Sequence, residues 1–250
     1  MKIYVLNLAR NKAIKLCVIF LICISIVLSA VVGITMKIYG RSLISEMTNA
    51  ALENKIIILD AGHGGEDPGA ISENGVYEKD LNLAITLEIG RILCEEGYAV
   101  VYTRTDDRLL YKEEEDVKGI RKISDLKNRC NVAEKYPDAL FVSIHMNSFG
   151  DRKYSGLQVY YSEKNDKSFA LADKIQSKVK GDLQQSNNRK TKEGKNMYVL
   201  ENINNVAVLI ECGFMSNPEE LKKLSEKEYQ KELSFSIVCG IIEYISENNV

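Results

Sequence analysis

Short, uninterrupted apolar runs recur from residue 55 onward, and each is bounded by polar residues or glycine. The first is KIIILD, from Lys55 to Asp60. A continuous apolar run of this length is typical of a strand that is buried on both faces of a sheet. Similar runs predict five further strands: Tyr98–Thr103, Ala139–His145, Gly156–Tyr161, Met197–Glu201 and Val206–Glu211.

Stretches in which apolar residues recur at helical spacing separate these runs. They predict helices over Asp80–Glu95, Asp125–Tyr136 and Lys167–Lys180, and a last helix in which Tyr229, Leu233, Ile237, Ile241 and Tyr244 share one face. Strands that alternate with helices predict an α/β fold. We expect a single domain with a twisted, mainly parallel or mixed sheet that is flanked by helices on both faces.

The N-terminal segment is predicted to lie outside this fold. Residues 16–36 carry no charge and match the ~20 residues that a helix needs to cross a bilayer. Basic residues are more frequent before this run than after it, so the positive-inside rule predicts a cytoplasmic segment 1–15, a transmembrane anchor 16–36, a linker 37–54 and an extracytoplasmic catalytic domain 55–250. A cleaved signal peptide is the alternative, although its apolar core is usually only ~7–15 residues long.

Composition excludes little beyond a nucleic-acid partner. The formal net charge is −2, which gives no electrostatic reason to bind nucleic acid. The cysteines of the predicted domain form no CxxC metal motif. They are expected to be buried free thiols, with one disulfide left open; they are Cys94, Cys130, Cys212 and Cys239.

Polar side chains stand at the ends of several predicted strands. His63 follows the first strand, His145 ends the third and Glu211 ends the last, while Glu78 precedes the first helix. In open α/β sheets, sites form at the carboxyl ends of the strands. His63 and His145 are the only histidines of the chain, and two histidines with one carboxylate are a common ligand set for catalytic zinc. The strand ends therefore predict a zinc site.

Glycines flank the first histidine, in the stretch ILDAGHGG. Gly62 and Gly64 would let the backbone turn sharply and let a metal and substrate approach closely. Asp60, just before them, is expected to hold the loop or to orient a ligand.

The wider pattern resembles a known family. The matching stretches occur in the family's order and cover nearly all of residues 55–250; they are ILDAGHGGEDPGA, YEKDLNLAI, VVYTRTDD, LKNRCNVA, LFVSIHMNS, GLQVYY, VAVLIECGFMSNPEE and YQKELSFSIVCGIIEYI. The chain resembles the zinc-dependent N-acetylmuramoyl-L-alanine amidases (amidase type 3) of bacterial cell-wall and sporulation systems. The resemblance implies hydrolysis of the amide between the lactyl group of N-acetylmuramic acid and L-alanine in peptidoglycan.

The resemblance also implies roles for single residues. His63, Glu78 and His145 would be the Zn²⁺ ligands and Glu211 the catalytic acid and base. The sequence departs from the family at two positions, because Ala61 and Val206 stand where the family usually has proline. Both positions stiffen the backbone, so the departures bear on the rigidity of the loops and not on the reaction.

Each of two arginines has two alternative roles. Arg189 lies in a lysine-rich loop and is expected to contact carboxylates of the stem peptide, with a solvated charged loop as an equal alternative. Arg104, in the stretch TRTDD, either lies near the cleft or pins a loop through ion pairs.

The chain looks most similar to the small membrane-linked, germination-specific amidases of spore formers. These strip stem peptides from the cortex glycan so that muramic-δ-lactam can form. This implies peptidoglycan glycan strands and stem peptides as partners, together with the membrane. It further implies a place on the cell-wall side of a membrane, in the space between forespore and mother cell, and it is compatible with an accessory lipoprotein. A vegetative cell-wall amidase (autolysin) is the alternative.

Three other classes compete with this interpretation. One is another zinc hydrolase, such as a peptidase or a polysaccharide deacetylase; a deacetylase would want an aspartate-rich metal motif and paired histidines, and the chain has only two histidines. A non-catalytic peptidoglycan-binding module would be expected to lack a ligand or Glu211. A serine hydrolase built on Ser143 would need a nucleophile elbow, which the sequence does not contain.

Overall fold

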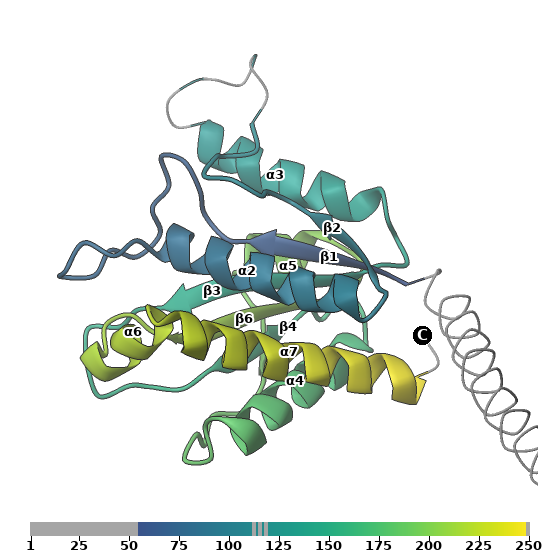
Figure 1. Ribbon diagram of the computed structural model, residues 1–250. Helices are drawn as coiled ribbons and strands as arrows, with labels where there is room; N and C mark the ends of the chain where they lie inside the picture. Colours follow the sequence, from purple (N-terminus) through teal and green to yellow (C-terminus); the bar gives the residue numbers. More distant parts are fainter. Residues whose placement is uncertain (1–54, 112–113, 115–116, 118–119, 249–250) are drawn as a thin grey trace, which may run out of the picture. The chain divides into compact units, whose positions relative to one another are not determined.

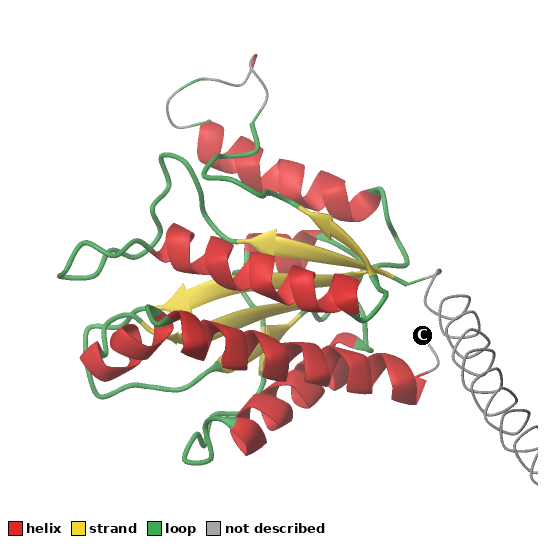
Figure 2. Cartoon of the chain, in the orientation of Figure 1, coloured by secondary structure: helices red, strands yellow, loops and turns green. Residues whose placement is uncertain are grey.

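The computed structural model describes residues 55–111, 114, 117 and 120–248. Strands alternate with helices along this part of the chain (Figures 1 and 2). The strands are β1 (Ile56–Ala61), β2 (Ala99–Tyr102), β3 (Leu140–Asn147), β4 (Gln158–Tyr161), β5 (Lys192–Glu193) and β6 (Val206–Phe214). The helices are α2 (Glu78–Glu95), α3 (Arg121–Glu134), α4 (Ser168–Asp182), α5 (Tyr198–Asn202), α6 (Pro218–Leu224) and α7 (Lys227–Asn248).

The strands form one mixed sheet in the order β2-β1-β3-β6-β4-β5. Strands β2, β1, β3 and β6 are parallel to one another. Strand β4 is antiparallel to β6, and β5 is parallel to β4. Helices α2, α4 and α7 pack on one face, and α3 and α5 cover the other (Figure 1). The predicted α/β domain with a mainly parallel, helix-flanked sheet is confirmed.

Two-residue alternation along the central strands decides where the polar residues lie. On β3, Leu140, Val142 and Ile144 join the larger core, under α2, α4 and α7. The residues between them face α3 and α5, and along that face the strand changes from buried Phe141 to Ser143 and then to His145. Apolar packing therefore gives way to polar chemistry towards the carboxyl end of the strand.

One predicted strand is a helix. The segment Met197–Glu201 was expected to be extended, but Tyr198–Asn202 forms α5. Val199 and Leu200 are consecutive in the sequence and both are buried in the core below α3 and α5. A strand would point two successive side chains to opposite faces, whereas a helical turn places both against the same core. A five-residue apolar run is compatible with either structure, so periodicity could not decide.

Helix α6 was not predicted, although the sequence signals it. Asn217 accepts hydrogen bonds from the backbone N–H groups of Glu219 and Glu220 at 3.1 and 3.2 Å, and Pro218 occupies the first turn. An asparagine N-cap followed by proline is a typical helix start.

Several boundaries of helices and strands differ from the predicted ones, as does the burial of two cysteines. Helix α2 begins at Glu78, and β3 and β6 continue beyond His145 and Glu211. The four cysteines of the domain are free. Cys130 and Cys212 are buried as expected, but Cys94 is exposed and Cys239 is intermediate.

The predicted segments 1–15, 16–36 and 37–54 lie outside the described residues. Within the part of the chain that the structure describes, no helix is both long enough and apolar enough to cross a bilayer. The transmembrane anchor therefore stays a prediction.

Candidate metal centre and active site

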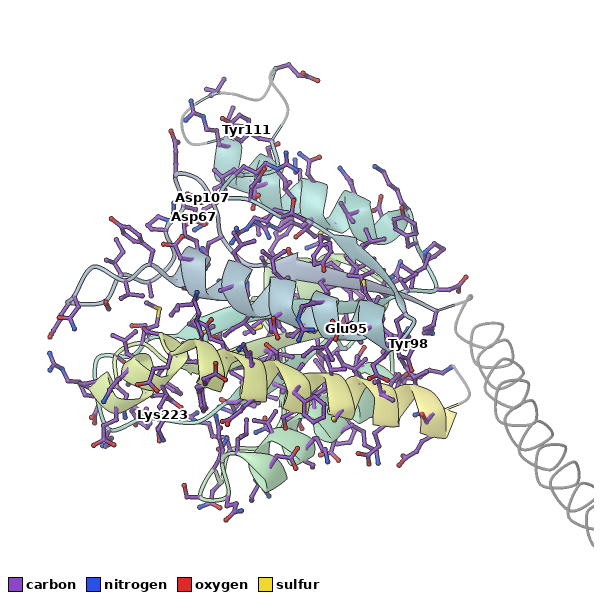
Figure 3. All side chains as sticks on the ribbon, in the orientation of Figure 1. Asp67, Glu95, Tyr98, Asp107, Tyr111 and Lys223 are labelled. Atoms are coloured by element: carbon purple, nitrogen blue, oxygen red, sulfur yellow. The ribbon has the colours of Figure 1, made fainter. Side chains whose placement is uncertain are left out.

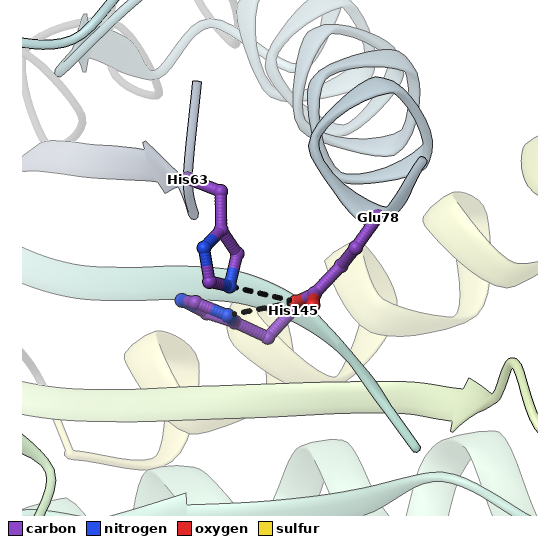
Figure 4. Close-up of side chains that lie close together, drawn as sticks. All are labelled: His63, Glu78 and His145. Carbon is purple, nitrogen blue, oxygen red and sulfur yellow. Dashed lines mark hydrogen bonds and ion pairs between the residues drawn. The ribbon is translucent and has the colours of Figure 1, made fainter. Parts of the chain in front are cut away.

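Three of the predicted site residues meet at the carboxyl ends of β1 and β3. His63 lies in the loop after β1, Glu78 is the first residue of α2 and His145 lies in β3 (Figure 4). Glu78 Oε1 lies 3.2 Å from His63 Nε2 and 3.1 Å from His145 Nδ1. One ligand atom from each residue lies within 4.8 Å of the other two.

This spacing fits a tetrahedral metal ion. Ligand atoms at about 2.0–2.2 Å from zinc lie roughly 3.3–3.6 Å apart at tetrahedral corners. The two separations from Glu78 Oε1, 3.2 and 3.1 Å, are close to that edge length. The three residues can thus hold a metal ion and leave a fourth position for water or substrate.

The Glu78 carboxylate is held in place by the backbone. Its Oε2 accepts a hydrogen bond from Ala70 N at 2.8 Å, and its Oε1 accepts from Met146 N at 3.1 Å and from the Asn82 side chain at 3.3 Å. Burial raises the pKa of Glu78, but hydrogen bonds with both histidines outweigh burial and hold the pKa below its usual range. Glu78 is therefore an ionised ligand with a fixed orientation.

Asp67 orients His63 from the side away from the ligand set. Asp67 Oδ2 lies 2.9 Å from His63 Nδ1 and 3.2 Å from the ammonium group of Lys122. Figure 3 shows Asp67 at the opposite end of α2 from Glu95. A carboxylate on one ring nitrogen fixes the tautomer and leaves the other nitrogen, Nε2, for the metal. Sequence reasoning missed Asp67, although it lies four residues after His63.

Two buried arginines pin the backbone of the His63 loop. Arg104 donates to the carbonyls of Ala61 and Gly62 at 2.9 Å, and Arg129 donates to the carbonyls of Ala61 at 2.7 Å and His63 at 2.8 Å. One of the two roles expected for Arg104 was to pin a loop through ion pairs. Arg104 does pin the loop, but it does so by donating hydrogen bonds to carbonyl oxygens. These bonds supply rigidity where Ala61 replaces the proline of the family.

The backbone near His63 requires its glycines. A Cβ atom on Gly62 would lie 2.2 Å from the ring of His145, so only glycine allows that imidazole to pack against the loop. Gly64 has a φ of +139°, which L side chains rarely adopt. His63 itself has a φ of +60°, a conformation that is uncommon outside glycine. The surrounding hydrogen bonds must hold His63 in this geometry.

Asp60 acts on the loop and not on a histidine. Its carboxylate accepts hydrogen bonds from the hydroxyls of Thr103 and Ser143, at 2.7 and 2.6 Å, and pairs with Arg129 at 2.5 Å. Of its two expected roles, the structure therefore supports the one in which Asp60 holds the loop. Ser143 donates its hydroxyl to Asp60, which also pairs with Arg129, so Ser143 takes part in the same network.

Glu211 lies beside the ligand set on the neighbouring strand. His145 and Glu211 are register partners in β3 and β6, so their side chains extend from the same face of the sheet. The Oε2 atom of Glu211 is buried and has no hydrogen-bond partner among the described residues. Burial, offset in part by the two histidines, raises the pKa of Glu211 to about 7. A carboxyl group with this pKa can accept and return a proton near neutral pH.

One cavity of about 310 Å³ contains these groups. His63, His145 and Glu211 line it together with residues that the sequence analysis did not identify. Those additional lining residues include Asp67, Lys122, Leu126, Asn196, Met197 and Tyr198. Asp67 follows His63 in the same loop, whereas the others come from α3 and from the start of α5, far along the chain from the strand-end motifs. Sequence spacing gave no signal for those residues of α3 and α5.

Arg189 lines a different cavity. Its guanidinium donates to the Ser155 carbonyl at 2.8 Å and to Gln158 Oε1 at 3.1 Å, and it stacks over the Phe214 ring at 4.4 Å. Its cavity, of about 500 Å³, shares no lining residue with the cavity of His63 and Glu211. The role of Arg189 in substrate binding stays a prediction.

The profile of N-acetylmuramoyl-L-alanine amidases (Amidase_3) matches residues 57–243, which include the three-residue ligand set and Glu211. The chain belongs to this amidase family. It is therefore an enzyme that cleaves the amide between N-acetylmuramic acid and L-alanine in peptidoglycan, as the resemblance implied.

Similar proteins include amidases of spore germination. The germination-specific N-acetylmuramoyl-L-alanine amidase of Bacillus subtilis (strain 168) is 35% identical over 196 residues, which are 78% of this chain and 82% of the relative. The CwlD amidase of Clostridioides difficile, solved in complex with the GerS lipoprotein, is 41% identical with a TM-score of 0.74 and covers 77% of this chain and 99% of that one. These relatives support the predicted resemblance to the germination-specific branch.

The chain is also similar to an amidase whose name refers to the cell wall and not to germination. The probable cell wall amidase LytH of Staphylococcus aureus is 34% identical over 200 residues, which are 78% of this chain but 60% of the relative. The shared part is therefore the amidase domain, and LytH contains additional sequence.

Proposed function

We propose that the enzyme is a zinc amidase in which His63, Glu78 and His145 bind Zn²⁺ and Glu211 moves the proton. The observation that carries this proposal is the meeting of three ligand atoms beside a buried carboxyl group with an unpaired oxygen. Zinc at this site would supply Lewis-acid polarisation and a water molecule of lowered pKa. Amides are poor electrophiles with poor leaving groups, which is why the site needs both a metal and a proton carrier.

The protein groups divide the remaining work. Glu211 Oε2 takes a proton from the attacking water and returns it to the leaving amine of L-alanine. Because Oε2 has no hydrogen-bond partner among the described residues, no competing hydrogen bond must be broken first. Asp67 keeps Nε2 of His63 directed at the ligand set, and Arg104 and Arg129 keep the loop rigid.

The proposal is tested with purified full-length protein in detergent and peptidoglycan from which contaminating proteins have been removed. We expect new L-alanine amino termini to appear with one equivalent of bound zinc and to stop after chelation, with recovery on adding zinc back. His63→Ala and His145→Ala should hold no stoichiometric zinc. If either variant keeps its zinc, the ligand assignment is wrong.

The substrate in the cell is proposed to be spore-cortex peptidoglycan. Support comes from the germination-specific relative in Bacillus subtilis and from CwlD. Removal of the stem peptide frees the lactyl carboxyl that muramic-δ-lactam formation requires. Spores of a deletion strain should therefore lack muramic-δ-lactam and regain it when the wild-type gene is restored, but not with Glu211→Gln.

A vegetative cell-wall role is the second candidate, and the similarity to LytH favours it. It predicts altered cell separation or autolysis of growing cells in the deletion strain, with normal spore cortex. The same strain therefore distinguishes the two candidates.

The enzyme is further proposed to work on the outer side of a membrane, held by residues 16–36. The uncharged apolar run and the excess of basic residues before it support this orientation. An accessory lipoprotein is proposed as a partner, because the CwlD amidase was solved with the GerS lipoprotein. Zinc titration of the enzyme, with and without lipoproteins co-purified from sporulating cells, tests whether a partner tightens the metal site.

A further inference from the structure

The cavity that contains His63 and Glu211 has an unequal distribution of charge on its border. Among the described residues that line it, the basic side chains other than the histidines are Lys122 and Arg129. The side chain of Arg129 is only 2% exposed and is paired with Asp60 and Asp125. The side chain of Lys122 is 63% exposed and contacts Asp67 at 3.2 Å. Lys122 therefore presents a cation to solvent at the edge of the site.

The border of the cavity at the start of α5 carries no formal charge. Asn196, Met197 and Tyr198 contribute it, at the start of α5. Tyr198 is 37% exposed, so this border offers an aromatic surface without formal charge. The cavity thus has a cationic border from α3 and an uncharged border from α5.

The substrate of an N-acetylmuramoyl-L-alanine amidase has the same asymmetry about the bond that is cleaved. The glycan on the lactyl side carries no charge, whereas the peptide on the L-alanine side carries free carboxylates, the nearest on the γ-linked D-glutamate that comes after it. We propose that Lys122 binds this carboxylate and so fixes which half of the substrate lies towards α3. The uncharged border at α5 then faces the glycan half.

Lysine is suited to this task because its ammonium group has three donors. The contact with Asp67 uses one of them and holds the head of Lys122 near the site. The other two donors are available to an arriving carboxylate. Lys122 would contact the peptide of the substrate and not the metal or its ligands. Its loss should therefore affect recognition of the peptide more than the chemical step.

The test uses two matched substrates: glycan chains with L-alanyl-γ-D-glutamyl stems, and the same chains with the α-carboxyl converted to a carboxamide. We expect the wild-type enzyme to have a kcat/KM about tenfold higher on the free acid, because the carboxamide lacks the negative charge that strengthens the hydrogen bond with Lys122. Lys122→Gln should lower kcat/KM on the free acid by about the same factor, mainly through KM, and should leave the carboxamide unaffected. Lys122→Arg should keep the preference.

Lys127→Gln is the matched control, because Lys127 is also exposed on α3 but does not line the cavity. Its kinetics should equal those of the wild type. Equal losses on both substrates, or loss of zinc in Lys122→Gln, would overturn the inference and assign Lys122 to the support of Asp67 and His63. Unchanged kinetics in Lys122→Gln would also overturn it. The inference rests on the proposed amidase function. If that function were wrong, the wild-type enzyme would cleave neither substrate, which differs from every result that would overturn the role of Lys122 alone.

Discussion

At the scale of single residues, the burial of Glu211 links catalysis to stability. Its pKa of about 7 exceeds the ordinary value of 4.5, so the folded protein keeps this proton to higher pH than the unfolded chain does. The contribution of Glu211 to the free energy of unfolding therefore falls as pH rises from 4.5 to 7. The enzyme keeps a carboxyl group where ionisation is costly because the reaction needs a base there.

Glu211→Gln should separate the two effects. The amide keeps the shape but cannot accept a proton, so the rate should fall by ~10²–10⁴-fold while zinc content is unchanged. In metal-free protein at pH 8, the variant should be more stable than wild type by about 1–3 kcal/mol, and the difference should vanish near pH 4. Thermal unfolding in chelator at both pH values measures this. A variant that loses its zinc would make Glu211 a ligand and not a base.

Asp67 should control metal affinity through His63. Burial lowers the pKa of His63, but the hydrogen bonds that its ring makes to the carboxylates of Asp67 and Glu78 outweigh burial and raise the pKa to about 9. Zinc binds only the neutral ring, so the zinc affinity of metal-free protein should rise with pH up to about 9. Asp67→Asn should weaken zinc binding by about 10–100-fold and move this rise to lower pH. Calorimetric titration at several pH values measures both effects.

Asp106→Asn is the control for that experiment, because Asp106 pairs with exposed Arg108 and not with a histidine. It should bind zinc as the wild type does. An Asp67→Asn variant with unchanged zinc affinity at every pH would show that the carboxylate does not orient His63.

At the scale of elements, Arg129 joins α3 to β1 and to the metal loop. Its side chain is 2% exposed and contacts Asp60, Asp125 and two loop carbonyls. Arg129→Met would leave two buried carboxylates without their cation, so the free energy of unfolding should fall by about 3–5 kcal/mol. Urea unfolding measures this loss. Arg91→Met, which removes exposed ion pairs on α2, should unfold at nearly the wild-type urea concentration.

The same element shows what sequence could and could not predict. The ligand residues stand at the ends of apolar runs, and the rule that sites form at the carboxyl ends of strands places them together. The contact between Arg129 and Asp60 spans 69 positions, and nothing in local spacing indicates it. Likewise, Lys122 enters the cavity only because α3 packs beside the His63 loop. The segment Met197–Glu201 was misassigned because five residues are too few to separate a helical period from an extended one.

At the scale of the whole molecule, the sheet divides its two faces between stability and function. The face under α2, α4 and α7 is a continuous apolar core. The face under α3 and α5 has a smaller core that ends below the catalytic residues. In β1, Ile57 and Leu59 join the larger core and Ile58 joins the smaller one, so this strand contributes to both faces, and it also leads into the metal loop. The fold therefore depends on β1 and on the chain after it, and we expect it to form without residues 1–52.

A chain that begins at Glu53 tests this independence. Lys55 is 8% exposed and Ile57 is fully buried, so this cut preserves every described contact. We expect a protein that is soluble without detergent, with the thermal midpoint and zinc content of the full chain. Only the full chain should partition into membranes, if residues 16–36 are the anchor. A second chain that begins at Gly62 lacks β1 and should not fold, which circular dichroism would report. Aggregation of the chain from Glu53 would instead show that the domain needs its N-terminal segment.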